Sequence, residues 1–109
     1  MYQPGDVVLI PFPFSDLQTT KRRPVLVLGE PDQRNDFPCL AITSRPQKHF
    51  AVAITQEDLQ EGKMPKASWI RIDKVYTLST ALVVNRFGQL TPACYSLVHQ
   101  KFCKHFVCT

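Results

Sequence analysis

The sequence predicts a small, mainly β fold in which five to seven short strands close into a compact barrel, with one C-terminal helix packed on it. Three observations carry this prediction. Short β-branched or alternating segments recur through most of the chain, turn residues separate them, and one helical repeat follows from Pro92. The 109 residues, 44% of them hydrophobic, suffice for one domain with its own core. We therefore expect a single domain over residues 1–109.

The first two strands are predicted from their apolar residues. Residues 6–12 are β-branched and apolar. Pro11 and Pro13 cannot donate to a ladder, so we expect this strand to end at a sheet edge or exit. The polar and basic segment 15–23 predicts a loop. Residues 24–28 are continuously apolar, which indicates a strand buried on both faces.

Four further strands are expected, at residues 37–44, 49–54, 68–73 and 75–84. The basic turn 45–48 is expected to join the first two of these into a hairpin. Alternation in 68–73 indicates a half-buried strand. Residues 56–62 predict one short helical turn with Thr55 as its cap, and Gly88 is expected to break the strand pattern.

A helix is predicted from about Pro92 to Phe106. Thr91 suits the capping position, and Pro92 suits the first helical position, where its missing N–H costs nothing. Apolar residues then recur at roughly helical spacing, and basic residues lie near the end, where cations suit the helix dipole.

Charge and hydropathy narrow the function classes. The net charge of +4 suits a polyanionic partner, although on charge alone an ordinary soluble protein is the simpler interpretation. No apolar run is long enough to span a bilayer, and the first residues lack the pattern of a secretory signal. We therefore expect a cytoplasmic protein without a membrane partner.

Four cysteines occur, at positions 39, 94, 103 and 108. None forms a C-x-x-C pair, and cytosolic thiols are usually reduced. With His99 and His105, the C-terminal cysteines could in principle bind zinc, but their spacing matches no common zinc pattern. We therefore expect neither a metal nor another cofactor.

Three stretches together resemble the MazF/PemK toxin family: residues 5–17 (GDVVLIPFPFSDL), 21–28 (KRRPVLVL) and 41–44 (AITS). Residues 69–78 (WIRIDKVYTL) add a weaker similarity. An Arg-Pro step that opens an apolar strand, after a Gly-Asp-Val strand and a polar loop, is fairly specific in combination. In order and spacing, these elements cover nearly the whole chain.

The resemblance implies a small SH3-like β-barrel of the CcdB/PemK-like class, usually a homodimer, acting as the toxin of a type II toxin–antitoxin system with a cognate antitoxin protein. It also implies a metal-independent endoribonuclease that cleaves single-stranded RNA by attack of the 2′-hydroxyl and leaves a cyclic phosphate. Two family positions carry over by residue: the arginine before the strand proline is Arg23, and the threonine that ends the next strand is Thr43.

These residue types suit that chemistry because RNA carries its own nucleophile. The enzyme must orient the 2′-hydroxyl, stabilise charge on the phosphorane and move protons. Arg23 could donate two hydrogen bonds to phosphate oxygens, and Thr43 could donate from a strand end. Without the resemblance, Arg23 is better explained as a solvated loop cation and Thr43 as a strand residue chosen for β-propensity.

Candidate substrate-binding residues in the neighbouring loops are Phe14, Asp16, Lys21, Arg22, Ser44, Arg45, Lys48 and His49. The basic ones could neutralise RNA phosphates, although a solvated surface explains each of them singly about as well. Ser44 could donate as Thr43 does, Phe14 could stack a base, and His49 could transfer a proton. No acidic catalytic helper maps clearly onto the short loop that carries Asp16.

Two other functions remain open at this point. One is a non-catalytic barrel that inhibits a protein target such as a topoisomerase, which rests on fold analogy alone. The other is an inactive relic that only binds nucleic acid. A non-catalytic inhibitor has no need of the Arg23 and Thr43 pair, so these two residues favour the endoribonuclease.

Overall fold

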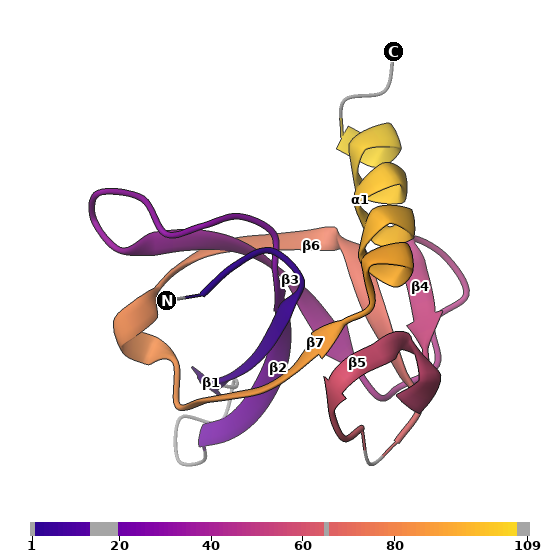
Figure 1. Cartoon of the computed structure of the whole chain (residues 1–109), viewed down its shortest axis with the longest axis horizontal. Helices are drawn as coiled ribbons and strands as arrows, with labels where there is room; N and C mark the ends of the chain where they lie inside the picture. Colours follow the sequence, from indigo (N-terminus) through magenta and orange to yellow (C-terminus); the bar gives the residue numbers. More distant parts are fainter. Residues whose placement is uncertain (1, 14–19, 65, 107–109) are drawn as a thin grey trace.

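The computed structural model describes residues 2–13, 20–64 and 66–106. In this part of the chain, seven strands form one antiparallel sheet in the order β4-β6-β3-β2-β1-β7-β5. They are β1 (Asp6–Pro13), β2 (Thr20–Val27), β3 (Asp36–Thr43), β4 (Ala51–Ile54), β5 (Leu59–Gly62), β6 (Ser68–Ser79) and β7 (Asn85–Leu90). The sheet curls into a half-barrel, and helix α1 (Pro92–Phe106) stands beside its β4 and β6 side (Figure 1). The predicted mainly β fold with a C-terminal helix is confirmed.

The hydrophobic core occupies both faces of the curled sheet. On one face, the larger cluster joins residues of β1 to β7 to Cys94 and Val98 of α1. On the other face, a second cluster contains Val25 and Val27 of β2. Leu26 between them belongs to the first cluster, because successive strand residues point to opposite faces. All three side chains are fully buried, as the apolar run predicted.

The helix prediction holds at both ends, since α1 begins at Pro92 and ends at Phe106. The Thr91 hydroxyl oxygen accepts a hydrogen bond from the backbone N–H of Cys94 at 3.2 Å, as expected of a capping threonine. Among the described residues, no helix is both long and apolar enough to cross a membrane.

Two strand predictions need correction. Strand β4 pairs with β6 and not with β3, so the turn at 45–48 joins no hairpin. The reason is that β6 lies between them: Ile70 is opposite Ile42 of β3 on one side and Val52 of β4 on the other. Moreover, the strands expected at 68–73 and 75–84 are one strand, β6, whose pairing with β3 continues through a register shift.

Other segment predictions fail where pairing outweighs composition. Strand β2 begins at Thr20, so Arg22 and Arg23 lie in a strand opposite Pro11 and Ile10, not in the expected loop. The short helical turn expected at 56–62 is confirmed for Gln56–Asp58 (η1), with Thr55 at its N-cap, whereas residues 59–62 form β5. A second 3-10 turn, Thr80–Leu82 (η2), occupies part of the strand expected at 75–84.

Gly88, which was expected to break the strand pattern, lies inside β7. The strand expected at 49–54 begins later, because β4 starts at Ala51, and His49 therefore precedes it. The exit predicted for β1 holds, because its pairing with β7 ends at Leu9 and β2 alone pairs with its proline-containing end.

A buried carboxylate ties the β7 side of the half-barrel to β1. The Asp6 side chain is 1% exposed and accepts hydrogen bonds from the Gln3 backbone N–H and from the Gln89 side chain, both at 3.0 Å. It also pairs with Arg86 at 3.2 Å, which in turn reaches Glu61 of β5 at 2.8 Å. Because buried charges are costly unless paired, this network fixes where β7 and β5 sit.

The close pairing of β5 with β7 leaves no room for a side chain at Gly62. Its φ of +89° favours glycine, and a Cβ there would collide with the carbonyl oxygen of Phe87. Gly62→Ala should therefore lower the free energy of unfolding by at least about 2 kcal/mol, measured by urea denaturation. Gly29→Ala is the control, because it adds the same methyl group without a collision with the backbone: the nearest atom to its Cβ would be a ring carbon of Pro38, 3.2 Å away. It should lower the free energy of unfolding by less than Gly62→Ala does. Equal stability of Gly62→Ala and wild type would contradict the described β5–β7 contact.

Candidate functional site

The candidate site lies where β2 and β3 separate. The Val27 carbonyl accepts from Gly5 on the β1 side, whereas the Leu28 N–H donates to Pro38 on the β3 side, both at 2.9 Å. Because backbone groups alternate along a strand, position 24 also faces β3. Pro24 has no N–H to donate there, and the pairing of β2 with β3 ends one residue later, at Val25.

Two hollows open at this end of the seam between β2 and β3. One has a volume of about 430 Å³ and the other about 510 Å³. Their shared walls are Arg23, Pro24, Ile42, Thr43 and Arg45. The two hollows therefore adjoin one another around the same strand ends, and together we call them the groove.

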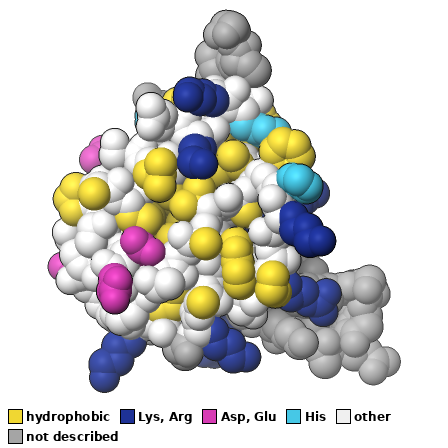
Figure 2. Space-filling model, turned by 90° about the vertical axis from the view of Figure 1, so that its right-hand side faces the viewer, with side chains coloured by type: hydrophobic (Ala, Val, Ile, Leu, Met, Phe, Trp, Pro, Cys, Tyr) yellow, Lys and Arg dark blue, Asp and Glu magenta, His cyan; other side chains and the backbone are white. Residues whose placement is uncertain are grey.

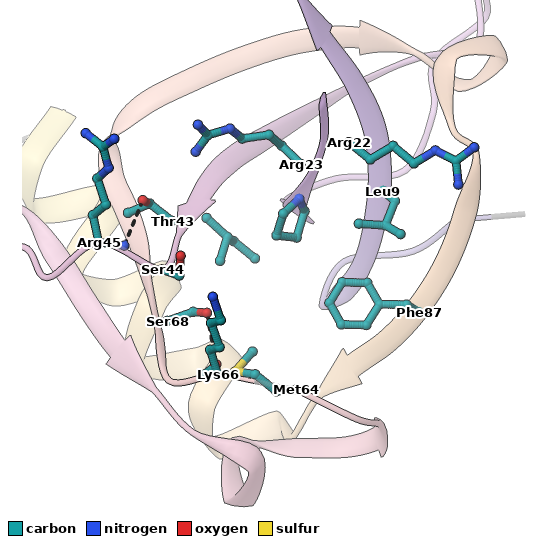
Figure 3. Close-up of a pocket in the computed structure, with 12 residues that line it drawn as sticks. Leu9, Arg22, Arg23, Thr43, Ser44, Arg45, Met64, Lys66, Ser68 and Phe87 are labelled. Carbon is teal, nitrogen blue, oxygen red and sulfur yellow. Dashed lines mark hydrogen bonds between the residues drawn. The ribbon is translucent and has the colours of Figure 1, made fainter. Parts of the chain in front are cut away.

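Arg23 and Thr43 both line the two hollows, and strand register explains why they lie in the same part of the groove. In each of the three β2–β3 pairs, such as Val25 with Ala41, the two residue numbers add up to 66. The numbers 23 and 43 also add up to 66, so Arg23 and Thr43 are the positions that would face each other if the same register were continued by two residues. Figure 3 shows the Arg23 guanidinium directed toward Thr43 and Arg45, whereas Arg22 is directed the other way, past Leu9. This opposition is expected of neighbouring residues in one strand.

The Thr43 hydroxyl is positioned by its own turn. Its oxygen accepts a hydrogen bond from the Arg45 backbone N–H at 3.1 Å (Figure 3). With one lone pair held there, the hydroxyl proton can be donated into the groove. The pairing of Thr43 with Trp69 of β6 fixes the backbone beneath it.

The groove is strongly basic. Its cationic lining residues are Arg22, Arg23, Arg45, Lys66, Arg71 and Lys74. None of the lining residues in the described part of the chain is acidic. Arg71 is held by the Asp73 carboxylate through contacts of 3.0 and 3.3 Å. Such a lining attracts a polyanion and suits phosphate groups in particular.

The structure brings together five of the residues predicted for the site: Arg22, Arg23, Thr43, Ser44 and Arg45 all line the groove. Two do not, since Lys48 and His49 line neither hollow and are exposed beyond Gln47. Phe14 and Asp16 lie outside the described residues, as does the side chain of Lys21.

Sequence reasoning missed the opposite walls of the groove. Met64, Lys66 and Ser68 come from the segment that leads into β6, and Phe87 comes from β7. Their only common feature is where the curled sheet places them, so no local pattern could have identified them. Arg71 and Lys74 fall in the stretch 69–78, whose weaker family similarity was the one available signal.

The buried cysteines are unsuited to nucleophilic chemistry. Burial raises the pKa of the Cys39 thiol to about 12, and burial together with the charge of Asp58 raises that of Cys94 to about 11. A raised pKa keeps a thiol protonated at neutral pH, and the thiolate is the reactive form.

Cys103 lies beside His99, and its sulfur is 3.8 Å from the nearer ring nitrogen of that histidine. In the described ranges, His, Cys, Asp and Glu side chains form no group of three that could hold a metal.

Comparison with solved structures shows the same fold in an endoribonuclease and in MazF. An endoribonuclease in complex with its cognate antitoxin from a mycobacterial species superimposes with a TM-score of 0.74 at 18% identity, over 100% of this chain and 98% of the other. The MazE–MazF crystal structure from Deinococcus radiodurans gives a TM-score of 0.78 at 16% identity, over 99% and 98% of the two chains. A search of curated protein sequences finds no match.

The family relationship rests on the sequence of nearly the whole chain. A model of the PemK-like, MazF-like toxins of type II toxin–antitoxin systems matches residues 3–106, a range that includes every described strand, the groove and the helix. The chain therefore belongs to the family of PemK-like, MazF-like toxins of type II toxin–antitoxin systems.

Proposed function

We propose that this toxin is a metal-independent endoribonuclease that cuts single-stranded RNA in the groove between β2 and β3. The observation that carries the proposal is that Arg23 of β2 and Thr43, the last residue of β3, both line the same basic groove just beyond the last β2–β3 pair. Both structural relatives compared above share the fold, and the mycobacterial one is named an endoribonuclease. Single-stranded RNA in the cytoplasm, including mRNA, is the proposed substrate.

In this mechanism the RNA supplies its own nucleophile. The 2′-oxygen forms a bond to the adjacent phosphorus, the bond to the 5′-oxygen of the next nucleotide breaks, and the products are a 2′,3′-cyclic phosphate and a free 5′-hydroxyl. One proton leaves the 2′-hydroxyl and one is delivered to the departing oxygen. The protein must hold the phosphate in line and stabilise the added charge, which needs fixed donors more than a metal.

The groove residues divide these tasks. Arg23 offers two parallel N–H donors to the non-bridging phosphate oxygens, and the oriented Thr43 hydroxyl offers a third. Ser44 lies next to Thr43 on the same groove wall and can donate to a neighbouring phosphate. Arg22, Arg45 and Lys66 add sequence-independent attraction for the RNA backbone.

Two protein partners belong to the same proposal. The mycobacterial relative is bound to its cognate antitoxin and the Deinococcus structure pairs MazE with MazF, so we infer an antitoxin partner for this chain. We also infer a homodimer. The sheet ends in edge strands β4 and β5, and an uncovered edge strand favours association with another chain.

The direct test of the proposed activity is cleavage of a long single-stranded RNA by the purified protein in EDTA. We expect discrete cuts whose 5′ fragments end in a cyclic phosphate, identified by mass spectrometry, with double-stranded RNA left intact. Loss of cleavage in EDTA and its recovery with magnesium would contradict the metal-independent mechanism. Binding without any cleavage would favour the non-catalytic alternatives.

Arg23→Ala should slow single-turnover cleavage at saturating protein by about a hundredfold or more, as expected from losing roughly 3–4 kcal/mol of transition-state stabilisation. Arg23→Lys should be nearly as slow, because lysine keeps the charge and loses the planar fork. Thr43→Val, which removes the hydroxyl and keeps the strand propensity, should also lower the rate constant.

Arg22→Ala is the matched control, since Arg22 neighbours Arg23 in sequence and is directed away from Thr43. It should weaken RNA binding in a salt-dependent way and leave the saturated rate close to that of the wild type. A larger loss of rate in Arg22→Ala than in Arg23→Ala would show that the other arginine contacts the scissile phosphate.

Light scattering at micromolar concentration should give about twice the chain mass of 12.4 kDa, because the inferred dimer covers one of the exposed sheet edges. A particle of the monomer mass would contradict the inferred homodimer without bearing on the chemistry of the groove.

A further inference from the structure

Phe50 combines two features that destabilise a fold. Its φ is +56°, in the left-handed region that a bulky residue rarely occupies, and its side chain is 56% exposed. A glycine would avoid the backbone strain, and a polar residue would avoid exposing the ring. Strain of this kind tends to gather at functional positions, so Phe50 needs an explanation in binding.

The surroundings of Phe50 are aromatic and basic. The ring centroid of His105 lies 4.9 Å from that of Phe50, and His49 lies 6.2 Å away. A hollow of about 290 Å³ beside the ring is lined by Phe50, Ala51, Ile72, Lys101, Lys104 and His105, and no acidic residue of the described chain is among them. Figure 2 shows histidine, hydrophobic and basic side chains gathered along one edge of this face. We call Phe50, Lys101, Lys104 and His105 the aromatic–basic patch.

The patch adjoins the groove through the edge of the sheet. Ala51 of β4 is paired with Arg71, which lines the groove, and the Phe50 carbonyl accepts from the Ile72 N–H at 3.0 Å. Neighbouring strands lie about 5 Å apart. Arg71 and Ile72 are consecutive in β6 and point to opposite faces of the sheet, so a strand of RNA that leaves the groove past Arg71 reaches the patch by passing around the short edge strand β4.

We propose that the aromatic–basic patch is a second RNA subsite, where an unpaired nucleobase from the segment flanking the cut stacks on Phe50 while Lys101 and Lys104 neutralise adjacent phosphates. This inference rests on the proposed function, because single-stranded RNA is the ligand in both. An exposed aromatic face flanked by cations is the arrangement that holds single strands without reading their sequence. The patch therefore contributes affinity for flanking RNA and leaves the choice of cut site to the groove.

The test is a binding measurement that needs no cleavage. The probes are two 5′-labelled single-stranded RNAs of about six and about eighteen nucleotides, the shorter being the centre of the longer, with deoxyribose at any position where cleavage is observed. Fluorescence anisotropy compares the wild type with Phe50→Gly and Phe50→Tyr. Leu82→Ala is the control for losing an exposed hydrophobic side chain, since Leu82 is 42% exposed in η2, far from α1 (Figure 1).

Phe50→Gly should weaken binding of the longer RNA by about tenfold and leave the shorter RNA within about twofold. Phe50→Tyr should bind both as the wild type does, because tyrosine keeps the stacking face. Lys101→Ala and Lys104→Ala should each reduce by about one the number of counterions released when the longer RNA binds. This number is read from the slope of the logarithm of the binding constant against the logarithm of the salt concentration. Urea denaturation should show Phe50→Gly at least as stable as the wild type, because glycine accepts a positive φ without strain.

Three outcomes would overturn the inference. Equal affinity of Phe50→Gly and wild type for the longer RNA would remove the patch from RNA binding, even if the wild type cleaves. A similar loss in Leu82→Ala would show a general surface effect. A change of particle mass in Phe50→Gly by light scattering would assign the patch to a protein interface. Conversely, binding that depends on Phe50 in a wild type that cleaves no RNA would support the subsite and refute the proposed activity.

Discussion

The geometry of the groove depends on one absent hydrogen-bond donor. Pro24 stands on the β3-facing side of β2, where any other residue could extend the ladder, and the pairing stops at Val25. Arg23 and Thr43 lie just beyond the last pair, Val25 with Ala41, and both line the hollows that open there. Proline also favours an extended backbone at the preceding residue, which keeps Arg23 in the strand.

The rest of the fold holds this opening in place. Val25, Leu26 and Val27 are fully buried, so β2 is anchored on both faces just behind the groove. Strand β6 is twelve residues long and pairs with β3 on one side and with β4 on the other, and its Arg71 lines the groove. The Asp6 network holds β7, whose Phe87 forms an opposite wall.

The charge pattern explains why so few groups suffice for the proposed reaction. A substrate with an internal nucleophile asks the protein for alignment and for stabilisation of negative charge. In the proposed reaction, the donors Arg23 and Thr43 provide both, because the sheet already orders the backbone of the strands that carry them. In the proposed reaction, the same cations stabilise charge and attract the polymer, so binding and chemistry take place in one groove.

Much of this arrangement could be predicted from the sequence. The apolar run at 24–28 predicted a buried strand, which holds for residues 25–27, while Pro24 and Leu28 are half-buried. Periodicity also identified the helix from Pro92, and family similarity singled out Arg23 and Thr43, which both line the groove. Local patterns failed where strand partners decide the structure. The polar residues at 20–23 form a strand because β1 pairs with them, and β4 pairs with β6 because β6 separates it from β3.

The far walls of the groove and the left-handed Phe50 depend on how distant segments pack. No local periodicity could reveal them. Met64 and Phe87, for example, come from separate segments and meet at the groove only after the sheet has curled.

The central claim is that the scissile phosphate lies between Arg23 and Thr43. A crystal structure of the protein with a single-stranded RNA that carries deoxyribose at the cleaved position tests it most directly, because the substrate is then bound and uncut. We expect the phosphate oxygens within hydrogen-bond distance of the Arg23 guanidinium and the Thr43 hydroxyl. An RNA whose cleaved phosphate lies elsewhere, with this groove empty, would contradict the account.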